Sequence, residues 1–142
     1  MIRKIEKSDK KIYTAFAEAF YHSNAVDHAV PESHYTVTFD ELMSSDRYAE
    51  GYILEYNGKP VGYALTAKTF SQEAGGMVVW IEELFVLPEY RGKGLGTEFF
   101  EFVKKHIEPD AARIRLEIEP DNTDAIRLYE RMGFKTLPYG QM

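Results

Sequence analysis

The sequence predicts one α/β (α+β) domain over residues 1–142, with a central mixed, mostly antiparallel twisted sheet flanked by about four helices. Three observations predict it. The dipeptide Asn57-Gly58, between two runs of strand type, is a strong hairpin signal. A glycine-rich turn joins the apolar run 84–87 to an amphipathic helix. A strand over 113–119 follows that helix, which predicts a parallel crossover.

The composition bounds the classes of protein that need to be considered. With 44% hydrophobic and 28% charged residues, the chain has ordinary globular values. Its net charge is −6 and its basic residues are scattered, so we expect no nucleic-acid partner and no membrane partner. Cysteine is absent, which excludes cysteine nucleophiles and thiolate metal sites. Neither a leader nor an apolar run of membrane length is recognised, so we expect a soluble cytoplasmic protein.

The N-terminal residues predict a short strand followed by a helix. Residues 2–5 are of strand type. Ser8 or Asp9 can cap the helix that follows. The apolar face of this helix is expected to consist of Ile12, Phe16, Ala19 and Phe20.

A long polar and aromatic segment, 21–35, comes next and contains three histidines. Loops of this length are often functional. No histidine–carboxylate pattern typical of a metal site accompanies the histidines, so we expect no metal there. Thr38 is expected to begin a short second helix through a capping box with Glu41, while Val37 packs on Leu42.

Three antiparallel strands are predicted in the middle of the chain. The first, 52–56, runs into the Asn57-Gly58 turn, and the second, 61–70, returns as its partner. After a further turn, residues 77–86 form the third.

The last third predicts a helix, a strand, a helix and a strand. The first of these helices is expected to bury Leu95, Phe99, Phe102, Val103 and Ile107. Apolar and charged residues alternate over 113–119, which predicts the strand. Asp121 or Asn122 can cap the last helix, Gly133 would end it, and Phe134 would open a final strand.

The glycine-rich turn has the chemistry of a phosphate-binding site. The first N–H groups of a helix lack partners within the helix and carry the positive end of its dipole, so they can bind an anion. Gly92, Gly94 and Gly96 lack Cβ, so their backbone can adopt positive φ and approach a pyrophosphate closely. Arg91 and Lys93 add positive charge. The glycines alone are equally compatible with a tight strand-to-helix connection.

Two common phosphate-binding motifs fit poorly. No lysine followed by Ser or Thr closes these glycines, as a Walker loop requires, and Thr97 stands where a dinucleotide fingerprint has its third glycine. The remaining pattern, Arg91-x-x-Gly94-x-Gly96 after a strand, resembles the pyrophosphate-binding motif of the GNAT superfamily of acyl-CoA-dependent N-acetyltransferases. The order of the elements also resembles the GNAT fold, and the run 81–86 resembles its polyamine acetyltransferase branch.

The resemblance implies acetyl-CoA as cosubstrate. Its pantetheine and acetyl carbonyl would lie along Leu84, Phe85 and Val86, for which plain core packing is an additional explanation. Its pyrophosphate would lie on Gly92, Lys93, Gly94, Leu95, Gly96 and Thr97, beside Arg91. Asn122, first of all a helix cap, would also hydrogen-bond the cofactor by resemblance.

A carboxylate is needed on the acceptor side, because an amine with a pKa near 10.4 is almost wholly ammonium at neutral pH and cannot attack. Alternation places Glu82 on the same face as Leu84 and Val86, and we expect Glu82 to act as base or ammonium anchor. Glu117 is the alternative base. It could instead be a solvated strand residue paired with Arg115.

Tyr129 lies on the apolar face of the last helix. The resemblance implies a general acid at this position, where a phenol can protonate a departing thiolate. The alternative is a core aromatic residue.

A small cationic amine is the expected acceptor, because the chain is acidic and Glu82 and Glu83 stand beside the reacting carbon, with Asp27 and Glu32 in the long segment. A peptide amine, or a non-catalytic acyl-CoA sensor, is the alternative. A homodimer is left open.

Overall fold

The computed structural model describes residues 1–23, 25–26 and 28–142. In chain order its elements are β1 (Ile2–Lys4), η1 (Lys7–Asp9), α1 (Lys10–Tyr21), α2 (Glu32–Ser44), β2 (Ala49–Tyr56), β3 (Lys59–Ser71), β4 (Gly76–Val86), η2 (Pro88–Tyr90), α3 (Leu95–His106), η3 (Glu108–Asp110), β5 (Arg113–Leu116) and α4 (Thr123–Arg131). Within the described ranges, no helix combines the length and the apolar character needed to cross a membrane.

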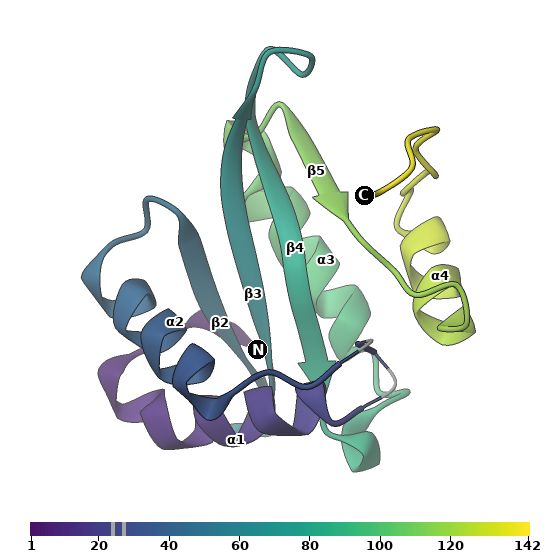
Figure 1. Cartoon of the computed structure of the whole chain (residues 1–142). Helices are drawn as coiled ribbons and strands as arrows, with labels where there is room; N and C mark the ends of the chain where they lie inside the picture. The colour runs from purple at the N-terminus through teal and green to yellow at the C-terminus, as the bar shows by residue number, and fades with distance from the viewer. Residues whose placement is uncertain (24, 27) are drawn as a thin grey trace.

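The strands form one sheet in the order β1-β2-β3-β4-β5. The first four strands pair antiparallel, whereas β4 and β5 pair parallel. Figure 1 shows α1 and α2 on one face of the sheet and α3 on the other. The predicted fold class, a mixed and mostly antiparallel sheet flanked by helices, is therefore confirmed. That residues 1–142 are a single domain stays a prediction.

Each face of the sheet is covered by its own apolar layer. The layer under α1 and α2 is largely aromatic and contains Tyr13, Phe16, Phe20, Tyr35, Phe39, Tyr63 and Phe85. The layer under α3 contains Tyr52, Leu54, Val61, Ile81, Leu95, Phe99, Phe100 and Val103, so Phe100 joins the face that was predicted for this helix. Because both layers include residues of β3 and β4, these strands are held from both sides.

The buried face of α1 differs from the predicted one. Tyr13 and Ala17 are buried beside Phe16, whereas Ala19 is exposed and Ile12 is only partly buried. Phe16 and Phe20 are buried as predicted. The helix turns Tyr13 toward the sheet in preference to Ile12, and the larger aromatic side chain removes more apolar area from water.

The predicted start of α2 is wrong. The helix begins directly after Pro31, whose φ of −59° suits the residue before a first turn. Thr38 lies inside the helix, where its hydroxyl donates to the carbonyl of His34 at 2.8 Å. Val37 is 69% exposed, so the expected contact with Leu42 that would fix the helix start is not made.

The predicted final strand is also absent. The segment after α4 has no regular secondary structure, although Gly133 ends the helix with a φ of 93°, as predicted. Phe134 packs instead on Phe100, with the ring centroids 5.4 Å apart. Pro138 lacks the N–H that a sheet ladder needs, and this disfavours a strand here.

Candidate active site

β4 carries a β-bulge at Glu82. Leu65 of β3 pairs with Glu83, whereas the next residue, Thr66, pairs with Ile81. Glu82 is therefore the extra residue, with no partner on β3. A bulge of this kind re-aims the side chains around it.

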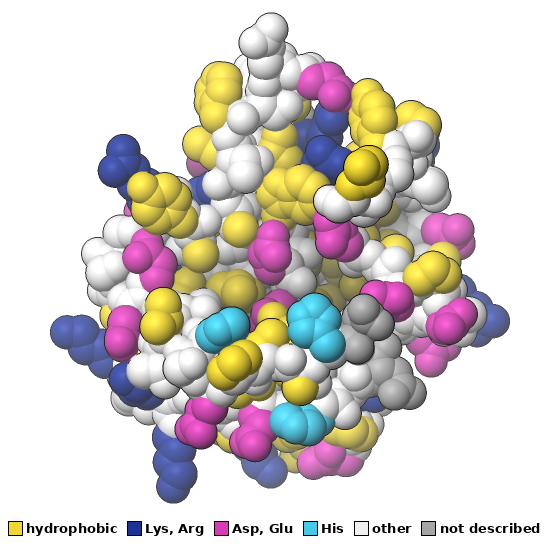
Figure 2. Space-filling model, viewed as in Figure 1, with side chains coloured by type: hydrophobic (Ala, Val, Ile, Leu, Met, Phe, Trp, Pro, Cys, Tyr) yellow, Lys and Arg dark blue, Asp and Glu magenta, His cyan; other side chains and the backbone are white. Residues whose placement is uncertain are grey.

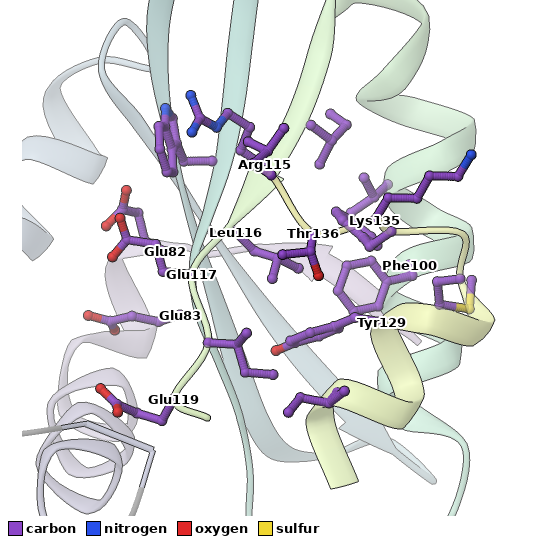
Figure 3. A pocket seen from close by; sticks show the side chains of 18 of the residues that line it. Glu82, Glu83, Phe100, Arg115, Leu116, Glu117, Glu119, Tyr129, Lys135 and Thr136 are labelled. Atoms are coloured by element: carbon purple, nitrogen blue, oxygen red, sulfur yellow. The ribbon is translucent and has the colours of Figure 1, made fainter. Parts of the chain in front are cut away.

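The bulge overturns the predicted orientation of Glu82. Leu84 and Val86 pack in the layer under α3, and Ile81 packs in the same layer. Ile81 lies an odd number of positions from each of them, so a regular strand would place it on the opposite face. Glu82 lines a pocket together with Glu83, and both side chains project to one side of the sheet in Figure 3. The expectation that Glu82 shares the face of Leu84 and Val86 is therefore wrong.

The bulge also marks the point where β4 and β5 separate. Residues 78–81 of β4 pair with Arg113–Leu116, and in the described part of the chain the pairing does not continue past the bulge. The strand predicted over 113–119 therefore ends at Leu116. On its β5 side, residues 82–86 have no neighbouring strand among the residues that the structure describes. An open strand edge of this kind can bind an extended ligand through its backbone.

A pocket of about 1220 Å³ lies where the two strands separate. Its walls come from the end of α1, from β4, β5 and α4, and from the segment after α4. Such a volume is ample for a small-molecule site. Acidic and histidine side chains gather on this face of the molecule (Figure 2). The charged residues on one side of the pocket are Glu82, Glu83, Glu117 and Glu119 (Figure 3).

Glu82 is an exposed residue of the pocket wall. Partial desolvation in the pocket raises the pKa of its carboxyl group, and the neighbouring charges of Glu117 and Glu83 raise it further. Glu117 forms no ion pair with any described residue. The guanidinium of Arg115, its suggested partner, lies over the ring of Trp80, 4.4 Å from the centroid. Glu117 is therefore a second pocket carboxylate and is not paired with Arg115.

Glu83 is buried, with 8% of its surface exposed, and already has partners. It accepts hydrogen bonds from the hydroxyl of Tyr21, at 2.5 Å, and from the hydroxyl of Tyr63. Burial raises the pKa of Glu83, while these two hydrogen bonds act in the opposite direction. This network has no signature in the sequence, because Tyr63 and Tyr21 lie 20 and 62 positions away from Glu83 and no local pattern links them.

Tyr129 lies on the opposite wall, on α4. This helix begins where predicted, because Oδ1 of Asn122 accepts a hydrogen bond from the N–H of Ala125 at 3.4 Å. The Tyr129 ring packs edge-on against Phe100, with centroids 5.5 Å apart, and its hydroxyl points into the pocket (Figure 3). Burial raises the pKa of Tyr129, so the phenol keeps its proton through neutral pH.

The glycine-rich turn has the backbone that the sequence predicts at two positions. Gly92 and Gly94 have φ values of 73° and 85°, and Gly94 is the N-cap of α3. A Cβ atom built on either residue would meet nothing within 4 Å, so the space beside this backbone is open. An anion can therefore approach the free N–H groups of the first turn of α3.

The backbone conformation predicted for Gly96 is wrong. Gly96 lies inside α3 and does not have positive φ. A Cβ atom on Gly96 would lie 2.7 Å from Cδ2 of Leu128. The missing side chain therefore allows α3 and α4 to pack closely.

The two basic residues of the turn are held in place by local contacts. Nε of Arg91 donates to the carbonyl of Val86 at 3.0 Å. Nζ of Lys93 lies 5.0 Å from the ring centroid of Tyr56 and 5.4 Å from that of Tyr90. The remaining predicted cofactor residues are buried or half-buried and offer chiefly backbone groups: Leu84, Phe85, Leu95 and Thr97.

Comparison with known families shows which class of protein this fold and site belong to. Residues 10–134 match the family model described as the acetyltransferase (GNAT) family. The chain belongs to this family, and the resemblance seen in the sequence is confirmed.

Two curated proteins are more than 30% identical in sequence to this chain over the matched residues. The chain is 35% identical over 100 residues to an uncharacterized N-acetyltransferase of Methanocaldococcus jannaschii, a match that covers 68% of this chain and 43% of that protein. It is 34% identical over 86 residues to the spermine/spermidine N(1)-acetyltransferase of Bacillus subtilis, covering 58% of this chain and 57% of that protein. The chain thus spans about half the length of the curated relatives it matches.

Solved structures agree on the fold. A possible acetyltransferase from Clostridium difficile 630 superposes with a TM-score of 0.85 at 20% identity, covering 100% of this chain and 94% of that one. An aminoglycoside N-acetyltransferase in complex with CoA gives a TM-score of 0.81 at 17% identity, covering 100% of this chain and 91% of that one. At these identities the likeness concerns the fold alone.

Proposed function

We propose that this chain is an N-acetyltransferase that transfers the acetyl group of acetyl-CoA to a primary amine by direct attack in a ternary complex. The observation that carries the proposal is that Glu82 and the hydroxyl of Tyr129 line opposite walls of one pocket, where β4 and β5 separate. Membership of the acetyltransferase family supports the acyl donor. Because the chain has no cysteine, transfer through a cysteine thioester is excluded, which favours direct attack.

The residues present fit acetyl-CoA. The open edge of β4, residues 82–86, can hydrogen-bond an extended pantetheine chain. The open backbone at Gly92 and Gly94 suits a pyrophosphate, with Arg91 and Lys93 beside it. When bound, acetyl-CoA supplies an activated acyl thioester.

The chemistry of this chain consists of two proton transfers. Glu82, the proposed base or ammonium anchor, takes a proton from the acceptor nitrogen, which must be neutral before it can form a bond to the acetyl carbon. Tyr129 donates its proton to the sulfur as the carbon–sulfur bond breaks. The raised pKa of Glu82 makes its ionised carboxylate a stronger base. The raised pKa of Tyr129 keeps the phenol protonated at neutral pH, so it has a proton to donate. Glu117 is the alternative base.

The proposed acceptor is a small cationic amine. The pocket also has basic side chains, those of Lys104, Arg113, Arg115 and Lys135. The carboxylates of Glu82, Glu117 and Glu119 lie together on one side of it (Figure 3), and the net charge is −6, so ammonium groups that do not react can be held on that side. The Bacillus subtilis relative, a spermine/spermidine N(1)-acetyltransferase by name, is in line with this chemistry. Of the two loop carboxylates invoked from the sequence, Glu32 is exposed in the first turn of α2 and Asp27 lies outside the described residues.

The test is the release of CoA thiol from acetyl-CoA with a panel of amines at low and high ionic strength. We expect polyamines and lysine-like amines to be acetylated, with kcat/KM falling as salt rises, because partly exposed charges are screened. Preference for uncharged amines, with no salt dependence, would contradict the proposed acceptor and leave the transferase intact. A peptide acceptor would be identified in the same panel. Binding of acetyl-CoA without thiol release for any amine would favour the acyl-CoA sensor.

Gly94→Val is expected to remove the stabilisation that acetyl-CoA gives the fold. Ligand binding to the native state stabilises it by about 2.7 kcal/mol at a ligand concentration of a hundred times Kd. A valine at this left-handed N-cap strains the backbone and covers the N–H groups that would bind the pyrophosphate. Thermal melts with and without acetyl-CoA measure the effect.

Gly75→Val is the matched control, since Gly75 also has positive φ and open space, but lies in the turn between β3 and β4, away from the pocket. Both variants should lose similar stability without ligand, while only Gly75→Val keeps the shift with acetyl-CoA. An undiminished shift in Gly94→Val would exclude the glycine-rich turn as the pyrophosphate site. Gly96→Val is unsuitable, because it would clash with Leu128.

A further inference from the structure

Two lysines and two tyrosines from separate segments converge beside the glycine-rich turn. Nζ of Lys59, at the start of β3, lies 5.5 Å from the ring centroid of Tyr90 and 3.3 Å from its hydroxyl oxygen. Nζ of Lys93 lies over both Tyr90 and Tyr56, whose ring centroids are 5.7 Å apart. Both ammonium groups are thus gathered around one ring, on the surface of the molecule.

These two charges are not neutralised by the protein. Throughout the described ranges, no carboxylate lies within ion-pair distance of either Lys59 or Lys93. Lys4 and Lys68 show the contrast, because both pair with Glu50, at 2.7 and 2.8 Å. Two like charges held around one aromatic ring repel each other, and the repulsion is relieved when an anion binds between them.

The anion can be identified by the chemistry of the proposed ligand. CoA carries a pyrophosphate and, one nucleoside further, a separate phosphate on the 3′ oxygen of the ribose. A phosphate monoester carries a charge of about −1.5 to −2 at neutral pH, which two ammonium groups would balance. The pyrophosphate already has the N–H groups of α3 and the nearby Arg91, so the 3′-phosphate is the group of CoA that still needs cationic partners.

We propose that Lys59 and Lys93 bind the 3′-phosphate of CoA, so that the chain distinguishes CoA from its dephospho form. Lys93 lies between Gly92 and Gly94, so its flexible side chain starts from the turn that would hold the pyrophosphate, and the 3′-phosphate is carried by the ribose attached to that pyrophosphate. Tyr56 and Tyr90 position the two ammonium groups. This inference rests on the proposed function, because it takes the glycine-rich turn as the pyrophosphate site.

The test is calorimetric titration of CoA and dephospho-CoA into the wild-type chain, Lys59→Met, Lys93→Met and the double variant, with no amine present. At low salt the wild type should bind CoA about tenfold more tightly than dephospho-CoA, a ratio that one good charged contact supplies. The double variant should bind the two ligands with nearly equal Kd. Lys59→Met, which leaves Lys93 beside the pyrophosphate, should keep its Kd for dephospho-CoA within about twofold of the wild-type value. Lys11→Met, which removes an exposed lysine of α1, should keep the preference.

Three results would overturn the inference while the proposed function stood. The wild type could bind both ligands equally, the double variant could keep the preference, or the substitutions could weaken both ligands to the same extent, which would assign the lysines to the pyrophosphate. If the wild type bound neither ligand, both this inference and the proposed function would be wrong. A preference that shrinks as salt rises would support charge recognition.

Discussion

Tyr129→Phe is expected to lower turnover by about 10² to 10⁴, the range for one positioned proton donor. The thiolate that leaves acetyl-CoA is a better leaving group when it is protonated, and Tyr129 is the hydroxyl that points into the pocket from α4. The affinity for acetyl-CoA should change little. Folding should survive, because the ring keeps its contacts with Phe100 and Phe134. Steady-state rates of thiol release, together with calorimetric Kd values, measure both quantities.

Tyr52→Phe is a suitable control, since Tyr52 belongs to the same apolar layer under α3 but does not line the pocket. This variant also loses a phenol hydroxyl and should keep its turnover. If Tyr129→Phe and Tyr52→Phe had the same turnover as the wild type, Tyr129 would be a core aromatic residue without a role in proton transfer. A fall in both variants would indicate a general effect on packing.

Glu82→Gln is expected to lower kcat/KM by about 10² to 10⁴, because glutamine cannot accept a proton from the acceptor amine. Only the ionised form of Glu82 can act as base. Since burial and the charges of Glu117 and Glu83 raise its pKa above the ordinary 4.5, the wild-type rate should fall as pH falls through that raised value. The acidic limb of the pH–rate profile should disappear in Glu82→Gln. All variants are compared with the same acceptor amine, so that the pH dependence of the amine's own protonation is the same in every pH–rate profile.

Glu117→Gln separates the two candidate bases. If Glu82 is the base, removing the charge of Glu117 should lower the pKa of Glu82, so the acidic limb moves to lower pH while most of the rate remains. A larger loss of rate in Glu117→Gln than in Glu82→Gln would make Glu117 the base. Glu101→Gln, an exposed substitution on α3 outside the pocket, controls for the change in net charge.

The fold could be predicted well where the determining contacts are local in sequence. Asn57 and Gly58 have φ values of 51° and 75°, as a tight hairpin turn between β2 and β3 requires. Asn122 caps α4 as its side-chain chemistry predicts. The prediction that Thr38 begins α2 was wrong, because a threonine in a capping box and a threonine inside a helix have the same local sequence pattern. Burial of Tyr35 and Phe39 places the helix start earlier, at Glu32.

The candidate site could be predicted only in part, because some of its features depend on contacts between residues far apart in the sequence. The glycine-rich turn is a local motif, so Gly92 and Gly94 could be assigned their backbone conformation in advance. The bulge at Glu82 depends on the register of β4 against β3. The regular alternation of a strand therefore predicted the wrong face of the sheet for this side chain. The hydrogen bonds from Tyr21 and Tyr63 to Glu83 depend on tertiary contacts alone.

A crystal structure of the chain with bound CoA tests the central claim most directly, namely that the separation of β4 and β5 forms an acetyl-transfer site. The account predicts pantetheine along residues 82–86, pyrophosphate on the N–H groups beside Gly92 and Gly94, and the sulfur within hydrogen-bonding distance of the Tyr129 hydroxyl. CoA bound outside this pocket, or with its sulfur out of reach of Tyr129 and its pyrophosphate away from the glycine-rich turn, would contradict it.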